Sequence, residues 1–357
     1  MADAYAKKRT LVRRNYAREG QMLESLGNGY IFDGAITPAT VIETNIFVMC
    51  VKYLHNFDLL AAGFFDGYVR LFSAKDAEPA GEIMDIQLRV NTAPVTSIKH
   101  GGSSGYVTNK FVATYGNGLV KCWNYESRKC EYTIIEKRET LGLEFHPSAT
   151  RFATVGNNPL INIYSEDTHR LEQVHSPSPE PERLSGHSSN VLCVRFHPLD
   201  TNEFVTGGWD NTVHVWDLRQ RSSVRHFSGV HMCGDAIDFS AAGSQLLTCA
   251  WQEEDPLQLW DYGSGRLIAA LHPDVFSSKL FCGGYIHKDF VACGGTTDNL
   301  FRVVDLRNNS TYGVMRGMPK GVFCMDVGPP RPKRNSQPQL PRLAIGCGAS
   351  ILEIDYR

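Results

Sequence analysis

The sequence predicts an all-β fold in which one structural unit is repeated about seven times. Short apolar runs rich in β-branched and aromatic residues, such as Phe204-Val205-Thr206, are separated by turn signals such as Asp66-Gly67 and Asn117-Gly118. Turn residues also recur six positions before an aromatic or aliphatic residue. No long apolar run with helical spacing accompanies this pattern. Together these observations indicate a repeat architecture of short antiparallel strands.

The repeat can be followed along most of the chain. Its closing positions lie 41 to 52 residues apart, close to the roughly 40–45 residues of a four-stranded unit with loop insertions. The turn and closing residues are Asp66 and Phe72, Asn117 and Trp123, Asn158 and Tyr164, Asp210 and Trp216, Glu254 and Trp260, Asp298 and Val304, and Gly348 and Ile354. The count favours seven units. Six or eight remain alternatives, because the last unit is degenerate and the interval before the fourth is long.

The fourth unit carries a motif that points to a family. Gly186-His187 precedes Thr206, Asp210 and Trp216, with His187 23 residues before Asp210 and Asp210 six residues before Trp216. This set resembles a complete WD repeat, the unit of one β-propeller blade. The resemblance implies a seven-bladed WD-repeat β-propeller. It also implies that His187, Thr206, Asp210 and Trp216 form a hydrogen-bonded relay whose role is structural and not catalytic.

The fifth unit departs from this motif. It keeps His231, Glu254 and Trp260, but Ala250 stands where we place the relay hydroxyl, so we expect its relay to be broken. Its acidic turn, 252–255, has consecutive carboxylates, which favours a solvated loop over a metal site. Because no other metal-ligating spacing, phosphate loop or nucleophile motif stands out, we expect no catalytic residue, no metal and no cofactor.

We expect two regions in the chain. Residues 1–27 form a basic N-terminal arm with few helix breakers, which is compatible with a helix, and residues 28–357 form the propeller. The last unit stops after its third strand, at Ile354-Asp355-Tyr356-Arg357. An open sheet edge there would invite aggregation. A segment near 29–33 or 39–42 is therefore expected to supply the missing strand and close the ring.

Composition limits the environment of the protein. The net charge of −2 gives no global reason to expect nucleic acid, and no apolar stretch of roughly 20 residues predicts insertion in a membrane. The ten cysteines are scattered and none forms a Cys-x-x-Cys pair, which favours free thiols in a reducing compartment. We expect a cytoplasmic protein, with a nuclear or ciliary location as the alternatives.

Large aromatic residues next to the turns suggest how the protein works. They precede the turns between second and third strands of four units, and they are Phe64, Phe65, Tyr115, Trp209 and Trp251. Several large aromatic side chains around one rim are typical of a protein-binding hot spot. We expect a non-catalytic interaction scaffold that binds proteins or peptides on this rim, as a monomer within a larger complex.

Two other features leave further options open. Trp216-Asp217-Leu218-Arg219 resembles the motif by which some WD-repeat proteins dock to a cullin-type ubiquitin ligase as substrate receptors, and Val304-Asp305-Leu306-Arg307 echoes it. Arg219 and Arg307 are then candidates for docking to an adaptor carboxylate. In addition, we expect the Ser-Pro loop at 175–183 to lie on the aromatic rim, because it leads into His187. Phosphates on Ser176 or Ser178 would then add negative charge beside the binding surface and could gate it.

Overall fold

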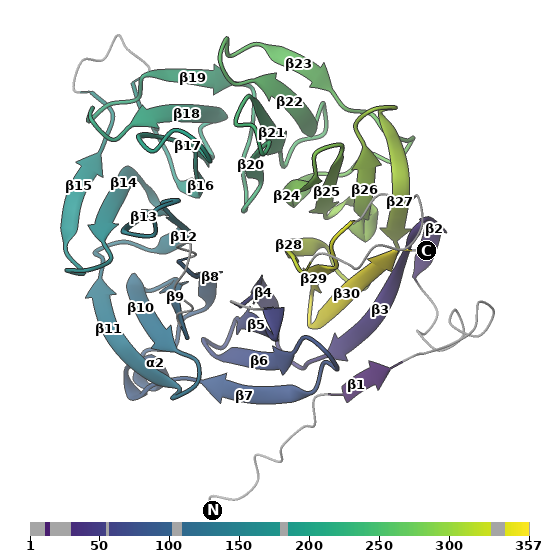
Figure 1. Cartoon of the computed structure of the whole chain (residues 1–357), viewed down its shortest axis with the longest axis horizontal. Coiled ribbons are helices and arrows are strands. Elements are labelled where there is room, and N and C mark those ends of the chain that lie inside the picture. Colours follow the sequence, from purple (N-terminus) through teal and green to yellow (C-terminus); the bar gives the residue numbers. More distant parts are fainter. Residues whose placement is uncertain are drawn as a thin grey trace, which may run out of the picture.

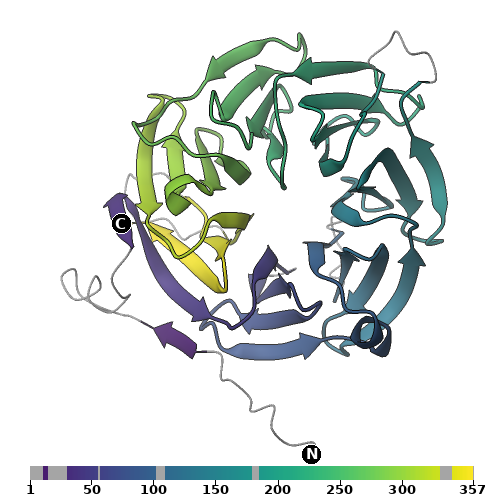
Figure 2. The ribbon, with the colours of Figure 1, turned by 180° about the vertical axis from the view of Figure 1, so that it is seen from behind.

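The chain forms a ring of seven β-sheets around a central axis, shown from one side in Figure 1 and from behind in Figure 2. A computed structural model describes residues 11–14, 30–54, 57–101, 109–178, 185–329 and 340–356. Neighbouring strands within each sheet are antiparallel, and the first strand of each blade lies nearest the axis. The prediction of an all-β, seven-bladed propeller is confirmed.

The blades follow one another along the chain. Blade 1 contains β4 (Val48–Tyr53), β5 (Leu59–Phe64), β6 (Val69–Ser73) and β7 (Pro79–Ile83). Blade 2 contains β8 (Val95–Lys99), β9 (Lys110–Tyr115), β10 (Leu119–Asn124) and β11 (Lys129–Ile135). Blade 3 contains β12 (Thr140–Phe145), β13 (Arg151–Gly156), β14 (Asn158–Ser165) and β15 (Leu171–His175). Blade 4 contains β16 (Val191–Phe196), β17 (Glu203–Gly208), β18 (Thr212–Asp217) and β19 (Arg225–Ser228).

The remaining blades complete the ring. Blade 5 contains β20 (Ile237–Phe239), β21 (Gln245–Cys249), β22 (Leu257–Asp261) and β23 (Leu267–Ala270). Blade 6 contains β24 (Leu280–His287), β25 (Phe290–Gly295), β26 (Phe301–Asp305) and β27 (Ser310–Arg316). Blade 7 contains β28 (Val322–Val327), β29 (Leu343–Cys347) and β30 (Ser350–Tyr356). The short helix α2 (Ile86–Val90) and the 3-10 helix η2 (Thr297–Asn299) lie in the connections β7–β8 and β25–β26.

Burial falls from the middle of each blade towards its outer strand. The second strand β17 is buried at five of its six positions, because neighbouring blades cover both of its faces. The outer strand β11 alternates between exposed and half-buried positions, as expected for a strand at the rim. Gly67 and Gly118 adopt φ of +81° and +85° in the turns before the third strands, a conformation that glycine adopts at no steric cost.

The last blade is completed from the other end of the chain. Strand β3 (Ile36–Glu43) pairs antiparallel with β30 and thereby becomes the fourth strand of blade 7. Strand β2 (Ile31–Gly34) does not take this place. It adds a fifth strand to blade 6 by pairing with β27. The segment at 39–42 therefore lies in the closing strand, whereas 31–33 lies in the neighbouring blade.

The N-terminal arm lies mostly outside the described residues. Its described part, β1 (Leu11–Arg14), is a strand that pairs with β3 at the outer edge of blade 7. At these four residues the expectation of a helix is therefore wrong, because the backbone satisfies its hydrogen bonds against a sheet edge. None of the helices among the described residues is long and apolar enough to span a membrane.

Candidate interaction surface

The relay residues of blade 4 are joined by hydrogen bonds. His187 Nδ1 donates to Asp210, with distances of 2.9 and 3.1 Å to the two carboxylate oxygens. The Thr206 hydroxyl lies 2.7 Å from His187 Nε2 and accepts the indole N–H of Trp216, also at 2.7 Å. His187, Thr206 and Trp216 are each at most 1% exposed. The chain of bonds therefore links the loop before β16 to the two middle strands of its blade.

The relay groups are held in hydrogen bonds within the protein, and the pKa of Asp210 reflects this. Burial alone would raise the pKa of Asp210, but bonds from His187, Thr212 and Ser188 hold it well below its usual range. His214 lies beside them, and burial lowers its pKa to about 3, which keeps the ring neutral. Ligand atoms of His187, Asp210 and His214 lie within 4.8 Å of one another, but the bond from His187 to Asp210 already occupies two of the three. The arrangement therefore works as a brace between loop and sheet.

The hydroxyl that bonds to the tryptophan of blade 5 is not the one expected from the sequence. The Trp260 indole N–H donates to the hydroxyl of Thr248 at 3.0 Å, so the relay hydroxyl is Thr248 and not Ala250. The turn of this blade is longer than in blade 4, which places Thr248 12 residues before its tryptophan where Thr206 is 10 before Trp216. The histidine half differs: His231 Nδ1 bonds to Asn211 at 2.7 Å. Blade 5 therefore keeps half of a relay.

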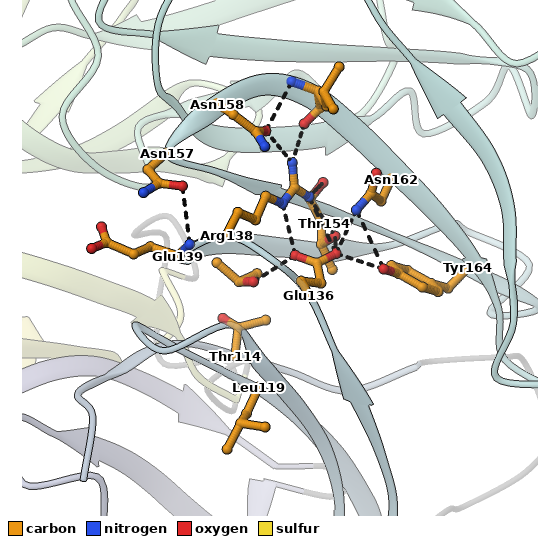
Figure 3. A network of polar contacts seen from close by, with 12 residues as sticks. Thr114, Leu119, Glu136, Arg138, Glu139, Thr154, Asn157, Asn158, Asn162 and Tyr164 are labelled. Atoms are coloured by element: carbon orange, nitrogen blue, oxygen red, sulfur yellow. Dashed lines mark hydrogen bonds and ion pairs between the residues drawn. The ribbon is translucent and has the colours of Figure 1, made fainter. Parts of the chain in front are cut away.

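Blade 3 holds a buried ionic brace that sequence reasoning missed (Figure 3). The carboxylate of Glu136 accepts bonds from Thr154 at 2.6 Å, Tyr164 at 2.8 Å and Asn162 at 2.8 Å. Arg138 Nε pairs with the same carboxylate at 2.9 Å, and both side chains are at most 4% exposed. Although burial by itself raises the pKa of Glu136, Arg138 and the hydroxyl donors lower it overall. Glu136 thus takes the place that His187 has in blade 4.

Other blades use charged pairs at equivalent strand positions. In blade 2, the buried Lys121 on β10 pairs with Asp85, the N-cap of α2, at 2.7 Å. In blade 6, Arg302 on β26 pairs with Asp274 at 2.8 Å. Lys121, Arg302 and His214 each lie opposite the relay position of the second strand in their blade. The same interior position is therefore stabilised by different chemistry in different blades.

Three of the five predicted rim aromatics are exposed. Phe65 is 60% exposed, Trp209 47% and Trp251 36%. Their backbone N–H groups donate to carbonyls that precede the inner strands, those of Phe47, Asn190 and His231. The three side chains therefore lie at the end of the ring where the inner strands begin.

Phe64 and Tyr115 are not part of this surface. Both are completely buried. The Tyr115 hydroxyl accepts the indole N–H of Trp123 at 3.0 Å, and Phe64 packs under the Arg70 guanidinium at 4.4 Å. The expectation that they contact a partner is corrected, because each fills the interior of its blade.

A ring of bulge residues, here called the collar, lines the mouth of the central channel at the same end. Six inner strands have a register shift after their first residue, and the extra residues are Met49, Thr96, Leu141, Leu192, Phe281 and Phe323. A β-bulge re-aims a side chain out of the regular pleat. All six line one pocket of about 430 Å³, and all are half-buried. Five of the six are apolar.

The collar continues into the exposed aromatics. Ring centroids lie 6.0 Å apart for Trp251 and Phe281, 4.9 Å for Phe281 and Phe323, and 5.1 Å for Phe323 and Phe47. These four rings form one aromatic row that crosses from blade 5 to blade 1. Contiguous apolar surface at the mouth of a channel is typical of a binding site.

Charged side chains line the channel below the collar. Lys99 of blade 2 reaches Asp235, in the loop before β20 of blade 5, at 2.7 Å, and Glu144 at 3.1 Å. Arg195 pairs with Asp235 at 2.9 Å and also with Glu144. Although burial would raise the pKa of Asp235, Arg195 and Lys99 hold it well below its usual range. The network spans the channel, so a ligand entering past the collar meets paired charges.

The collar leaves a signal in the sequence that we did not use. A β-branched or leucine residue, the collar residue and a cysteine recur as Val48-Met49-Cys50, Val191-Leu192-Cys193, Leu280-Phe281-Cys282 and Val322-Phe323-Cys324. Each cysteine faces a glycine of the second strand: a Cβ added at Gly63 would lie 2.6 Å from the Cys50 sulfur. Burial raises the pKa of Cys50 to about 12. These thiols therefore pack the space behind the collar.

The two candidate docking arginines are exposed but paired. The Arg219 side chain is 71% exposed and bonds to Asp217 through Nε at 2.9 Å and Nη2 at 2.5 Å. The Arg307 side chain is 56% exposed and pairs with Asp305 at 2.6 Å. Both lie after the third strand of their blades, at the opposite end from the collar. An adaptor carboxylate would therefore compete with a carboxylate of this chain.

Comparisons with known proteins agree with the geometry. The family model described as "WD domain, G-beta repeat" matches residues 180–217, which contain the blade 4 relay. The chain is also 24% identical over 175 residues to WD repeat-containing protein 89 homolog of Dictyostelium discoideum, covering 48% of this chain and 45% of that protein. One repeat of the chain therefore matches the WD-repeat family, and a protein named for its WD repeats is among the relatives.

Other relatives of the chain have different names. It is 29% identical over 224 residues to pre-mRNA-processing factor 19 homolog 2 of Arabidopsis thaliana, covering 60% of this chain and 38% of that protein. It is 24% identical over 200 residues to E3 ubiquitin-protein ligase COP1 of Pisum sativum, covering 55% of this chain and 28% of that protein. The chain thus spans less than half the length of each relative.

Proposed function

We propose that this propeller is a non-catalytic scaffold that binds a partner protein or peptide at the collar end of its channel. The observation that carries the proposal is the continuity of apolar surface there. The aromatic row joins the collar to the exposed Trp251, while Trp209 and Phe65 stand on neighbouring turns. Large aromatic anchors bury much area at low entropic cost, so a few of them carry most of an interface.

The polar groups of the described residues support a binding role over a catalytic one. The carboxylates of Asp210 and Glu136 are each held by several donors, and the Thr206 hydroxyl is bonded on two sides. A general base or nucleophile needs a free lone pair directed at a substrate. The channel carboxylates Glu144 and Asp235 are likewise paired with cations.

A double substitution tests this proposal. We expect Phe65→Ala/Trp209→Ala to keep the ring folded, because both side chains project into solvent, and to weaken the main partner at least about 30-fold, as for loss of a hot spot. The matched control is Leu199→Ala/Ile268→Ala, which removes two other exposed apolar side chains, 69% and 48% exposed. Leu199 follows the far end of β16. Quantitative affinity purification with both variants gives the answer, and an unchanged partner set in the first variant rejects the collar end as the binding surface.

We infer a second candidate function, substrate receptor of a cullin-type ubiquitin ligase. It is supported by the exposed Arg219 at the end of Trp216-Asp217-Leu218-Arg219 and by the similarity to a relative named as an E3 ubiquitin-protein ligase. Cullin and adaptor peptides should then co-purify with the wild-type chain and be lost with Arg219→Ala. Their absence from wild-type purifications rejects it. In either case we propose a cytoplasmic monomer within a larger complex, which imaging of the tagged chain and mass photometry check.

A further inference from the structure

The described start of the Ser-Pro loop rests against the neighbouring blade. Strand β15 ends at His175, and the next residue, Ser176, donates its backbone N–H to the carbonyl of Arg221 at 3.0 Å. Arg221 belongs to the turn between β18 and β19. Figure 1 shows β15 at the outer edge of the ring, next to the blade that contains these two strands. Ser176 therefore joins blade 3 to blade 4 at the circumference, away from the collar, so for this residue the expectation of a place on the aromatic rim is wrong.

A basic pocket lies at this junction. It has a volume of about 620 Å³, and its lining includes Ser176, Arg219, Gln220 and Arg221. Both arginines are exposed. The one carboxylate in the lining belongs to Glu172, and it is paired with Arg151 at 2.7 Å. The two guanidinium groups line the same pocket as Ser176, and the nearby acids are already paired, Glu172 with Arg151 and Asp217 with Arg219. An added anion would gain charge-assisted bonds to these guanidinium groups.

We propose that Ser176 is a phosphorylation site for a proline-directed protein kinase, and that its phosphate binds Arg219 and Arg221 in this pocket. Pro177 follows Ser176 directly, which supplies the residue that such a kinase requires. The kinase transfers the γ-phosphoryl group of ATP to the Ser176 oxygen. The bond from that phosphorus to the bridging oxygen of ADP breaks, and the serine proton passes to the base of the kinase. The product carries roughly −1.5 to −2 charges.

The modification changes how two blades are joined. The phosphate adds charge-assisted bonds between the end of β15 and the β18–β19 turn, where one backbone bond is present in the unmodified chain. It also competes with Asp217 for the guanidinium of Arg219, which Asp217 holds at 2.5 Å. Phosphorylation therefore orders the turn at 218–224. If the chain is a substrate receptor of a ubiquitin ligase, phosphorylation also makes Arg219 unavailable to an adaptor.

Ser178 provides an internal control. It is also followed by proline, but its backbone N–H donates to the Ser185 hydroxyl at 2.8 Å, and it does not line the basic pocket. A phosphate at residue 178 adds the same charge to the same loop without the same neighbours. A difference in effect between phosphoserine at 176 and at 178 therefore shows that the phosphate binds in the pocket, because the added charge is the same at both positions.

The experiment uses the full chain with phosphoserine incorporated at residue 176 or at residue 178. Amide hydrogen exchange over 218–224 should slow about tenfold with phosphoserine at 176, and less than about twofold with phosphoserine at 178. In the Arg219→Ala/Arg221→Ala background the effect at 176 should disappear. Equal effects at both positions, no effect at 176, or an effect that survives the double arginine variant each overturn the pocket assignment.

The modification itself is tested on the folded wild-type chain. Incubation with ATP and a mitogen-activated or cyclin-dependent kinase should add phosphate to Ser176, detected by peptide mass spectrometry, and Ser176→Ala should remove that peptide signal. If Ser176 stays unmodified while a denatured control is phosphorylated there, the site is inaccessible in the ring and the proposal is wrong. This result does not depend on the collar variants, so the two proposals fail independently.

Discussion

Replacing Asp210 by alanine tests whether the blade 4 relay stabilises the ring. The carboxylate accepts bonds from His187 Nδ1 at 2.9 Å, the Ser188 N–H at 2.8 Å and the Thr212 hydroxyl at 2.6 Å. Ser188 lies at the surface, so water replaces the carboxylate at its N–H group. The His187 side chain is fully buried and loses the acceptor of its Nδ1–H group, with only the Thr212 hydroxyl near that group, at 3.5 Å.

The expected loss follows from the two buried donors that lose this acceptor, the His187 N–H group and the Thr212 hydroxyl. A buried polar group without a partner costs about 1–3 kcal/mol, so Asp210→Ala should lower the free energy of unfolding by this amount. With an unfolding entropy of about 2.1 cal/mol/K per residue, the Tm of a chain of this length falls by roughly 1–4 °C. Differential scanning calorimetry and urea titration, followed by circular dichroism, measure the two quantities.

Asp255→Asn is the matched control. Asp255 occupies the equivalent turn of blade 5, but its side chain is 48% exposed and pairs with His272 at the surface. Such a pair contributes about 0–1 kcal/mol, and asparagine tolerates the φ of +47° found at this residue. Equal losses in the two variants, or a larger loss in the control, would refute the idea that the relay braces blade 4.

Three further predictions follow from the described side chains. Glu136→Gln should lower the free energy of unfolding by about 3–5 kcal/mol, because it leaves the buried Arg138 without its counter-ion. Glu131→Gln, at an exposed pair with Lys110, should lower it by about 0–1 kcal/mol. The urea midpoints of the two variants compare these losses. The pKa of His214 is about 3 in the fold and about 6.5 in the unfolded chain, so the unfolded chain binds a proton more readily as the pH falls. The free energy of unfolding should therefore be about 2 kcal/mol lower at pH 5 than well above pH 6.5. Over this range the Tm of His214→Asn should drop less than that of the wild type. Deleting residues 1–45 removes β3 and should cause aggregation in light scattering by exposing the edge of β30, whereas deleting 1–27 should leave a soluble ring; equal solubility of both truncations would contradict closure by β3.

The sequence predicted the parts of the fold that depend on spacing. The number of blades follows from the interval between closing positions. The relay partners of His187 follow from residue types at fixed separations within one blade. Spacing is insufficient where a loop changes length: a longer turn in blade 5 places the relay hydroxyl at Thr248, and not at Ala250 as the spacing predicts.

Two other errors arose because the position of a residue beside a turn does not fix the direction of its side chain. Phe65 points to solvent while the preceding residue, Phe64, fills the core. Tyr115 turns inward because blade 2 has Ala113 at the relay position, so the tyrosine hydroxyl takes the indole N–H of Trp123. The packing around each side chain, and not its distance from the turn, decides between these orientations.

The collar and the blade 3 brace are not predicted by any single sequence motif, because they depend on how residues from different strands come together. Glu136 lies 18 residues before Thr154, and His187 lies 19 before Thr206, so an acid at the spacing of the relay histidine was a usable signal. Phe281 and Phe323 meet at the channel mouth because bulges turn them there, and a bulge is a property of two paired strands.

The pairing of β3 with β30 also sets the order of events during synthesis. Thr44 at the end of β3 and Ala349 before β30 are hydrogen-bonded, yet they are 305 residues apart. At about 5–20 residues per second, the ribosome needs roughly 15–60 s to make the intervening chain. Throughout that time the edge of β3 that later pairs with β30 has no partner, and an open strand edge can pair with other chains. The edge of β3 that faces β30 therefore stays open until almost the whole chain has been made, although the finished ring holds β3 between β1 and β30.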